Sequence, residues 1–364
     1  MITQNSISTQ KLAKKWPYKF LNFLPGNKQY QFLNWKSRTF NSTEMFNFRI
    51  PFQKMEKGII LLPDHLGEIF LSLPLLSFFI KQCGNTNITV LCTDTFTNII
   101  SGFFKEIAIL EINKNEYFLE TKHFKNLTKK VSLIQADFFI QMNIQTNMLN
   151  LFLQKASQAK LKLNLGKESY PFANLNLMAT AQSNIFQLYQ EIVNYWKNQP
   201  SASLIKQLSI KADISYTKEI KQELVHARIN EKKICLFLWD DNPRNQQWQS
   251  DCIQKLERAM PGDFQLALVL PDTLKKNTLV LHGREKSIPY FQNLSLGKMI
   301  SLFFESSHII GLHTPMIHLA NYCGKKVTGL YVKEDKPFDT SLIFKKFHIK
   351  YIDTNAEFDG NDII

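Results

Sequence analysis

The sequence predicts an α/β protein with two domains, each a parallel β-sheet covered by helices on both faces. After residue 57, short runs rich in Ile, Val, Leu and Phe alternate with segments of helical periodicity, which is typical of parallel strands connected by helices. The alternation stops and restarts around Pro200. A chain of 364 residues is also too long for one ordinary hydrophobic core.

The first series of apolar runs predicts a domain over residues 58–198. Its first run, GIILLP, leads into a long apolar helix that extends to about residue 83. Five strands are expected, at 58–63, 87–92, 107–112, 137–142 and 160–165. Residues 199–215 are polar and lack periodicity, so they predict a linker.

The second series predicts a domain over residues 216–335 with the same plan. Its strands are expected at 234–239, 263–270, 278–283, 308–312 and 326–331, and its helices at 248–259, 296–305 and 314–323. Residues 336–364 are expected to form a tail that packs back on the domains. Because α/β proteins bind ligands beyond the carboxyl ends of their strands, chemistry is expected just after strands in both domains.

Positive charge is concentrated in residues 1–57, a basic aromatic extension. It contains ten Lys or Arg and two acidic residues, which is +8 of the net charge of +13. Aromatic residues such as Trp16 and Tyr18 are interleaved with the cations, so residues 1–50 predict contact with an anionic inner-leaflet membrane surface. A solvated or domain-packing extension explains the composition equally well. Nucleic acid is disfavoured because no nucleic-acid-binding signature accompanies the charge.

The cysteines indicate neither a disulfide framework nor a metal site. They are scattered, odd in number and without a CxxC pair, at Cys83, Cys92, Cys235, Cys252 and Cys323. Reduced thiols and no bound metal are therefore expected. The first 25 residues lack a signal-peptide core, and no uninterrupted apolar run reaches the roughly 18 residues of a membrane span. We expect a cytoplasmic protein, peripheral on the inner membrane if the extension binds lipid.

The turn after the first strand is the first candidate site. It reads Pro-Asp-His-Leu-Gly-Glu over residues 63–68, and Gly67 permits a tight approach just before the helix. Glu68 is expected near the helix N-terminus, where its carboxylate can accept a proton from an attacking hydroxyl. An acid at this position also complements the helix dipole. From composition alone, the dipole is the simpler explanation.

The turn before the helix expected at 314–323 is the second candidate site. The hydroxyl of Thr314 and the free amides of a helix N-terminus suit a diphosphate. His318, one turn further on, can donate a hydrogen bond to a phosphate oxygen of a leaving nucleoside diphosphate. The alternative is that Thr314 is only an N-cap and His318 only a packed core residue.

Both segments resemble glycosyltransferase family 9, the ADP-heptose:lipopolysaccharide heptosyltransferases. The run LLPDHLGEIFLSLPLL resembles the opening motif of the family, with matches at Gly67, Leu73 and Pro74 and with Glu68 in place of the catalytic Asp. Residues 294–332 resemble a helix, strand, turn, helix and strand of the family, aligned without gaps. The matches there are Gly311, Thr314, His318, Leu319, Ala320 and Gly324.

The sequence departs from the family in both turns. The Asp and Gly of the second turn are His313 and Pro315 here. Pro315 is tolerated at the first helical position, but it removes one N–H that could hold phosphate. In the first turn, the family usually carries Arg or Lys and small hydroxyl residues on the acceptor side, whereas this chain has Leu62, Pro63, Asp64 and His65.

A third and weaker match lies in residues 240–248. Trp248 agrees with the Lys-x-Trp of the family, but the Lys is Gln246. Arg244, two residues away, can substitute for the lost positive charge. A solvated arginine in a loop explains the same sequence.

The resemblance implies a GT-B fold, in which two Rossmann-like domains with parallel sheets face a central cleft. The N-terminal domain would bind the acceptor and the C-terminal domain the nucleotide-sugar. The implied reaction is inverting, metal-independent transfer from a nucleotide-diphosphate sugar such as ADP-heptose to a lipopolysaccharide or other lipid-linked acceptor, with no cofactor. Glu68 would be the catalytic base; donor binding falls to Thr314, His318, His313, Arg244 and Gln246, and the acceptor side to Asp64, His65 and Gly67. The altered positions also leave open a catalytically degenerate relative that binds a glycolipid or a partner protein.

Overall fold

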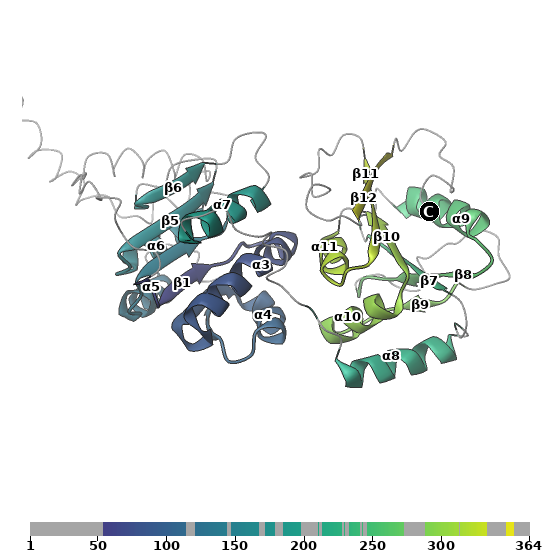
Figure 1. The fold of residues 1–364 in the computed structure, drawn as a ribbon, viewed down its shortest axis with the longest axis horizontal. Helices are drawn as coiled ribbons and strands as arrows, with labels where there is room; N and C mark the ends of the chain where they lie inside the picture. The colour runs from purple at the N-terminus through teal and green to yellow at the C-terminus, as the bar shows by residue number, and fades with distance from the viewer. Residues whose placement is uncertain are drawn as a thin grey trace, which may run out of the picture. The chain divides into compact units, whose positions relative to one another are not determined.

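The protein is described by a computed structural model, in which two compact units are distinguished, Met1–Leu204 and Ile205–Ile364. The division falls inside the stretch 199–215 expected to be a linker. Each unit contains one six-stranded parallel sheet (Figure 1). The described residues are 54–113, 121–143, 147–166, 172–178, 185–197, 210, 213–227, 229, 233–240, 242, 246–272, 288–312, 314–332 and 347–352. The extension at residues 1–50 lies outside them.

The sheet of unit 1 has the strand order β3-β2-β1-β4-β5-β6. Its strands are β1 Gly58–Leu61, β2 Ile88–Thr93, β3 Ala108–Ile112, β4 Phe138–Gln141, β5 Leu161–Gly166 and β6 Leu175–Met178. Its helices are α3 Leu66–Cys83, α4 Thr97–Phe103, α5 Lys122–Leu133, α6 Met148–Ala156 and α7 Ile185–Lys197, with 3-10 turns η3 Asn85–Asn87 and η4 Asp94–Phe96. The sequence predicted five strands for this domain, and its described residues contain six. The missed strand β6 is the short run LNLM, which is too brief for a distinct sequence signal.

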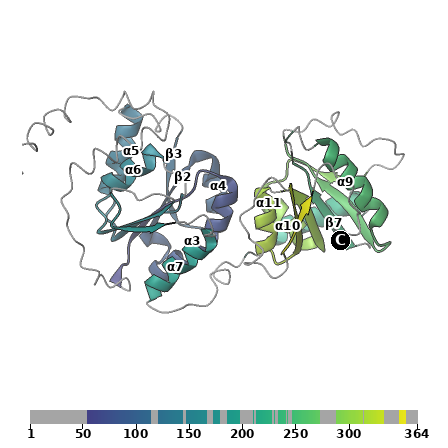
Figure 2. The ribbon, with the colours of Figure 1, turned by 90° about the horizontal axis from the view of Figure 1, so that it is seen from above.

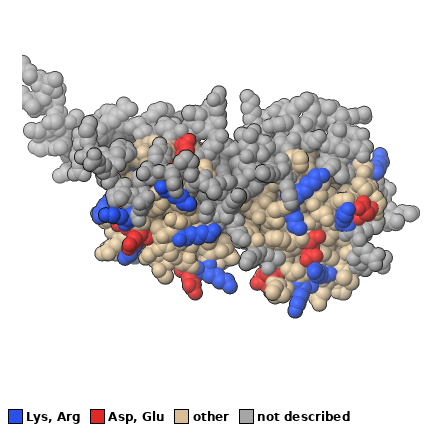
Figure 3. Space-filling model, viewed as in Figure 1, with Lys and Arg blue, Asp and Glu red and all other residues tan. Residues whose placement is uncertain are grey.

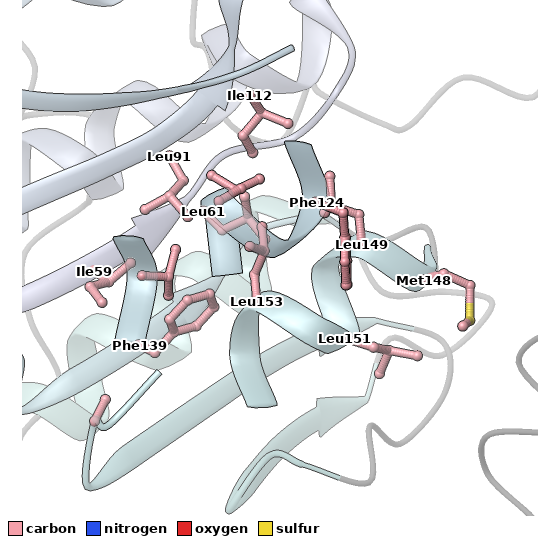
Figure 4. Close-up of a cluster of buried hydrophobic side chains, with 13 residues drawn as sticks. Ile59, Leu61, Leu91, Ile112, Phe124, Phe139, Met148, Leu149, Leu151 and Leu153 are labelled. Carbon is pink, nitrogen blue, oxygen red and sulfur yellow. The ribbon is translucent and has the colours of Figure 1, made fainter. Parts of the chain in front are cut away.

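Helices cover both faces of this sheet. Figure 2 shows α5 and α6 on one face and α3 and α7 on the other. Between the sheet and α5 and α6 lies a cluster of buried aliphatic and aromatic side chains, including Leu61, Phe139 and Leu153 (Figure 4). On the opposite face, the rings of Phe79 and Trp196 pack against Phe138 with centroids 5.3 and 4.9 Å away. The two cores fix the sheet, and with it the turns at its carboxyl edge.

Helix α3 is long and apolar enough to cross a membrane by length and composition, and no other helix among the described residues is. Of its 18-residue window, 61% is buried inside the protein. Every residue from Ile69 to Phe79 is buried. This is how a core helix of an α/β domain is packed, so its apolar composition is explained by the sheet that it covers.

The sheet of unit 2 has the order β12-β11-β10-β7-β8-β9. Its strands are β7 Lys233–Leu238, β8 Phe264–Val269, β9 Tyr290–Phe291, β10 His308–Leu312, β11 Lys326–Val332 and β12 Phe347–Ile352, and its helices are α8 Ile214–His226, α9 Gln246–Ala259, α10 Leu296–Glu305 and α11 Pro315–Tyr322. The strand expected at 278–283 lies outside the described residues. Residues 336–364 are not only a tail, because β12 pairs in parallel with β11.

Both sheets have a point at which the strand order reverses. In unit 1 it lies between β1 and β4, and in unit 2 between β7 and β10. The chain leaves such neighbouring strands in opposite directions, which opens a crevice beyond their carboxyl ends. Ligands of doubly wound sheets bind at this crevice, so the turns after these four strands are where a site is expected.

A buried histidine in unit 2 leads to a prediction about stability. His308 is 2% exposed, and its Nε2 lies 2.9 Å from Thr328 Oγ1. Burial, with Lys326 and His348 nearby, lowers the pKa of His308 from 6.5 to about 4. Between these values the unfolded chain binds a proton that the folded chain does not. Unit 2 should therefore lose about 3 kcal/mol of unfolding free energy as pH falls from 7 to 4.

Urea unfolding at pH 7 and pH 4.5 checks this prediction. The variant His308→Gln, which keeps a polar group opposite Thr328, should lose less stability between the two pH values than the parent does. An equal loss in parent and variant would assign the acid sensitivity to other groups.

Candidate functional site

The site in unit 1 is the turn that joins β1 to α3. His65 takes the N-cap position of α3 with an extended backbone (φ −116°, ψ 134°) and no side-chain capping bond. Its carbonyl accepts the first helical bond, from Ile69 N at 2.9 Å. Gly67 and Glu68 lie in the first turn of α3. The predicted residues 64, 65, 67 and 68 are thus brought together at the carboxyl edge of the sheet.

Glu68 has the environment of a strengthened base. Its side chain is half-buried, and its Oε2 is buried with no hydrogen-bond partner in the described part of the chain. Burial raises the pKa of Glu68 above its usual 4.5, His65 opposes this effect and Asp64 adds to it. A carboxylate with an unpartnered oxygen and a raised pKa can accept a proton from a hydroxyl placed beside it. A role limited to the helix dipole does not account for the unpartnered oxygen.

Asp64 is held by two asparagines that sequence reasoning did not single out. Its Oδ2 accepts hydrogen bonds from Asn143 Nδ2 at 2.9 Å and from Asn147 Nδ2 at 3.0 Å. Asn143 follows β4 and is 2% exposed. Asn147 caps α6, and its Oδ1 accepts a bond from Asn150 N at 3.0 Å. These bonds, which we call the Asp64 clamp, tie the turn after β1 to the segment after β4 across the crevice of the sheet. Polar residues just beyond a buried strand were the signal that could have revealed them.

The site in unit 2 is a cavity of about 330 Å³ at the carboxyl ends of β7, β8 and β10. Most of its wall is apolar, including Leu294 and Met299 on the side of α10. The remaining lining residues are Leu238, Trp239, Asp240, Val269, Leu270, Pro271, Asp272, Thr314, Pro315 and Met316. The cavity therefore lies at the strand-order reversal of this sheet, where the sequence predicted donor binding.

Thr314 lines this cavity from the start of α11. It occupies the N-cap position, but its side chain makes no capping bond. Its Oγ1 is buried and has no partner among the described residues. A threonine that served only as an N-cap would bond to an amide of the first turn. The hydroxyl therefore has unused hydrogen-bonding capacity, beside a helix N-terminus that favours anions.

Two acidic residues in the cavity were not predicted as site residues. Asp240 follows β7, and the buried Gln249 holds it by two bonds of 2.8 Å, from Asp240 N to Gln249 Oε1 and from Gln249 Nε2 to Asp240 O. Asp272 follows β8, and its Oδ1 accepts a bond from Asn293 N at 3.0 Å. Carboxylates at these strand ends suit hydroxyl groups, because in doubly wound domains an acid in this region binds a ribose hydroxyl. The cavity has no lysine or arginine among its described lining residues.

The other four residues predicted to bind the donor are not among the described residues that line this cavity. His318 lies one turn into α11, is 4% exposed, and is absent from the lining of the described cavity. Gln246 begins α9 and is half-buried. His313 and Arg244 lie outside the described residues. The roles of these four residues toward a donor stay predictions.

Close packing between two strands explains why residue 311 is a glycine. Gly311 is also one of the residues that match the family. It pairs with Leu238 where β10 meets β7. A Cβ at this position would lie 2.9 Å from Leu238 Cβ, closer than real Cβ contacts. Glycine therefore lets the two strands approach at the point where the cavity opens.

The fold and the two crevices define a class of two-domain α/β proteins that includes GT-B glycosyltransferases and nucleotide-sugar epimerases. No protein-family model matches the sequence, and no curated protein sequence matches it either. Solved structures do match. The chain is similar to a glycosyltransferase family 9 protein of Veillonella parvula DSM 2008, with 12% identity, a TM-score of 0.64, and coverage of 82% of this chain and 86% of the other.

Two further structures show how widely this fold is shared. A heptosyltransferase of E. coli, solved with ADP-2-deoxy-2-fluoro heptose, has 10% identity and a TM-score of 0.58 over 84% of this chain and 96% of its own. A protein of Listeria monocytogenes described as a UDP-N-acetylglucosamine 2-epimerase has 11% identity and a TM-score of 0.51 over 82% and 85%. The resemblance to family 9 is thus confirmed at the level of the fold. At such identities the likeness establishes fold and not chemistry.

Proposed function

We propose that the protein is a glycosyltransferase that moves a sugar from a nucleoside-diphosphate donor, with ADP-heptose the first to test, to a lipopolysaccharide or other lipid-linked acceptor. The observation that carries the proposal is Glu68, a half-buried carboxylate with an unpartnered oxygen at the strand-order reversal of unit 1. The transfer is direct and inverting, and it requires neither a metal nor a cofactor.

Glu68 acts as the base in this scheme. The acceptor hydroxyl attacks the anomeric carbon of the donor sugar and gives its proton to Glu68, while the bond from that carbon to the diphosphate breaks. The raised pKa of Glu68 strengthens it as a proton acceptor. Asp64, fixed by Asn143 and Asn147, positions the turn that carries the base and faces the acceptor side with His65.

The cavity of unit 2 binds the donor. Its apolar wall accommodates the nucleobase, and Asp272 beyond β8 accepts hydrogen bonds from ribose hydroxyls. The diphosphate lies at the N-terminus of α11, where Thr314 Oγ1 is unpartnered and the helix dipole favours negative charge. His313, His318, Arg244 and Gln246 are the further residues that we propose for its phosphates.

Binding of ADP to the full chain tests the donor site. Saturating ADP should raise the melting temperature, because a ligand that binds only the native state stabilises it. Thr314→Val, which keeps the shape and removes the hydroxyl, should weaken binding by about tenfold through the loss of one hydrogen bond to a charged group. The control Thr95→Val, on an exposed threonine of unit 1, should leave the affinity unchanged. Equal affinities in parent and Thr314→Val by calorimetry would remove Thr314 from the donor site.

A second candidate function is a catalytically degenerate relative that binds a glycolipid or a partner protein. The observation that favours it is the pair Asp240 and Asp272 in a cavity whose described lining has no cation, since both would repel a diphosphate. No binding of ADP, UDP or GDP at millimolar concentration would support this candidate. Micromolar binding of any of them would count against it.

We further propose that residues 1–50 contact the anionic inner leaflet and that the protein works in the cytoplasm. The excess of ten cations over two acids in residues 1–57 supports this. Lipid-linked acceptors are held in that leaflet, so attachment there would bring the enzyme to its substrate.

A further inference from the structure

The exposed face of α5 carries an unbalanced set of positive charges. Four of the twelve residues of α5 are lysines and none is acidic. Helix α5 is amphipathic, with Phe124, Leu127 and Val131 buried against the sheet. The outward residues, which we call the α5 surface, are Lys122, His123, Lys125, Asn126, Lys129, Lys130 and Leu133, and all of them are exposed. Figure 3 shows blue side chains, with red ones beside them, at the end of unit 1 where Figure 1 places α5.

The lysines of the α5 surface have no ionic partners in the described part of the chain. Two lysines of unit 2, the half-buried Lys298 and the exposed Lys221, contrast with them. Lys298 contacts Glu219 at 3.0 Å and Glu223 at 3.1 Å, and Lys221 contacts Glu305 at 3.6 Å. Charge on this part of unit 2 is therefore balanced within the protein, whereas the charge on α5 is not.

The placement of these cations along the helix adds to the imbalance. Lys122 lies in the first turn of α5, which has no acidic residue, and a cation there is unfavourable beside the positive end of the helix dipole. Asp137 follows the opposite end of the helix from Lys122, where its Oδ2 accepts bonds from the amides of Glu56 and Lys57, each at 3.0 Å. An anionic partner outside the protein would relieve the repulsion.

Leu133 indicates which kind of anionic partner fits. It ends α5 beside Lys129 and Lys130, and it is 71% exposed. A cationic helix face with an apolar side chain at its margin matches the interface of a bilayer, where lysines meet head groups and the apolar group enters the acyl boundary. No Phe, Tyr or Trp side chain is exposed on this face, and His123 is the one aromatic ring that it offers to a base, so a nucleic acid fits less well.

We propose that the α5 surface is a docking surface for an anionic lipid bilayer. Its lysines lie over the head groups, and Leu133 enters the interface. Helix α5 follows β3, so its first residue lies toward the carboxyl edge of the sheet, the edge that also carries the turn with Glu68. If the proposed transfer is correct, a membrane that lies along the whole of α5 also lies near this edge, at the end of the helix that Lys122 begins. Docking itself does not depend on the transfer.

Vesicle binding by the full chain tests the proposal. The probes are vesicles of phosphatidylcholine alone and of phosphatidylcholine mixed with phosphatidylglycerol, and the quantity measured is the partition coefficient by flotation. Lys125→Gln/Lys129→Gln should lower partition into the anionic vesicles by about 30-fold, which corresponds to about 1 kcal/mol per lysine. Leu133→Ser should lower it by about tenfold. Salt should weaken the binding of the parent.

The matched control is Lys105→Gln/Lys218→Gln, which removes the same charge from exposed positions outside α5 and should change partition by less than about twofold. Equal losses in the control and the α5 variant would overturn the proposal, because only net charge would then matter. It would also be overturned if the α5 variant lost binding to a fluorescent DNA duplex while its vesicle binding stayed unchanged. The assay contains no sugar donor, so a failure of the proposed transfer would leave its result intact.

Discussion

Replacing Glu68 by Gln should lower kcat for sugar transfer by about 10²- to 10⁴-fold, the contribution typical of a general base. The amide has nearly the shape of the carboxylate but cannot take the proton of the acceptor hydroxyl. The control Glu68→Asp keeps the acid group and should retain more activity than Glu68→Gln. The measurement is transfer of labelled sugar from ADP-heptose to a cell lipid extract, with ADP affinity measured in parallel. Undiminished kcat in Glu68→Gln would exclude this residue as the base.

The same reaction should depend on pH through Glu68. A base works when ionised, so activity should fall as pH drops through its pKa, which burial raises above 4.5. Asp64 raises that pKa and His65 lowers it. In the pH profile of kcat/KM, Asp64→Asn should therefore move the acid limb to lower pH, and His65→Gln should move it to higher pH. If both variants moved the acid limb of the profile in the same direction, that limb would report the titration of a group other than Glu68.

The second large effect is expected from Gly58→Ala, at the start of β1. Gly58 pairs with Phe138, and a Cβ on Gly58 would lie 2.0 Å from Phe138 Cζ. The ring cannot move aside easily, because Phe79 and Trp196 pack against it. We expect the unfolding free energy of unit 1 to fall by about 3 kcal/mol, the upper end of the usual cost of overpacking. Hydrogen exchange of the β1 and β4 amides that open only on unfolding should become about 100-fold faster.

Two further variants separate this packing effect from a general cost of replacing glycine. Gly262→Ala adds a Cβ that meets nothing within 4 Å, so its exchange rates should match those of the parent. Phe138→Leu is destabilising by itself, but it should make the added cost of Gly58→Ala smaller, because the two positions then no longer collide. If the losses of unfolding free energy in Gly58→Ala and Phe138→Leu were strictly additive, the clash between positions 58 and 138 would not be the cause of the destabilisation.

Much of the fold could be predicted because the strands are buried on both faces. Continuous apolar runs such as the one at β1 are typical of parallel strands covered by helices, and all but one of the runs proposed as strands coincide with strands of the structure, the exception at 278–283 lying outside the described residues. Among the described residues, the strands that were missed are β6, β9 and β12. Of these, β9 has only two residues, and β12 lies in a stretch interrupted by lysines. Edge strands are buried less completely, so their sequences carry less signal.

The candidate site could be predicted only in part. Glu68 and Thr314 follow strands directly, and the family resemblance pointed to both. Asn143 and Asn147 stand some 80 residues from Asp64 in sequence, so their contact with it depends on which strands become neighbours. Asp272 was overlooked for the same reason: a carboxylate beyond β8 has meaning only once β8 is placed beside β7.

The side-chain amide of Asn147 connects the start of α6 with the turn that carries Asp64. Its Oδ1 accepts a bond from Asn150 N in the first turn of α6, and its Nδ2 donates a bond to Asp64 Oδ2. Rotation of the side-chain amide would therefore break both bonds together. Serine, threonine and aspartate cap helices about as well, but none has a separate donor and acceptor at this reach. Replacing Asn147 by any of these three residues would therefore keep the helix cap but lose the bond from the amide nitrogen to Asp64.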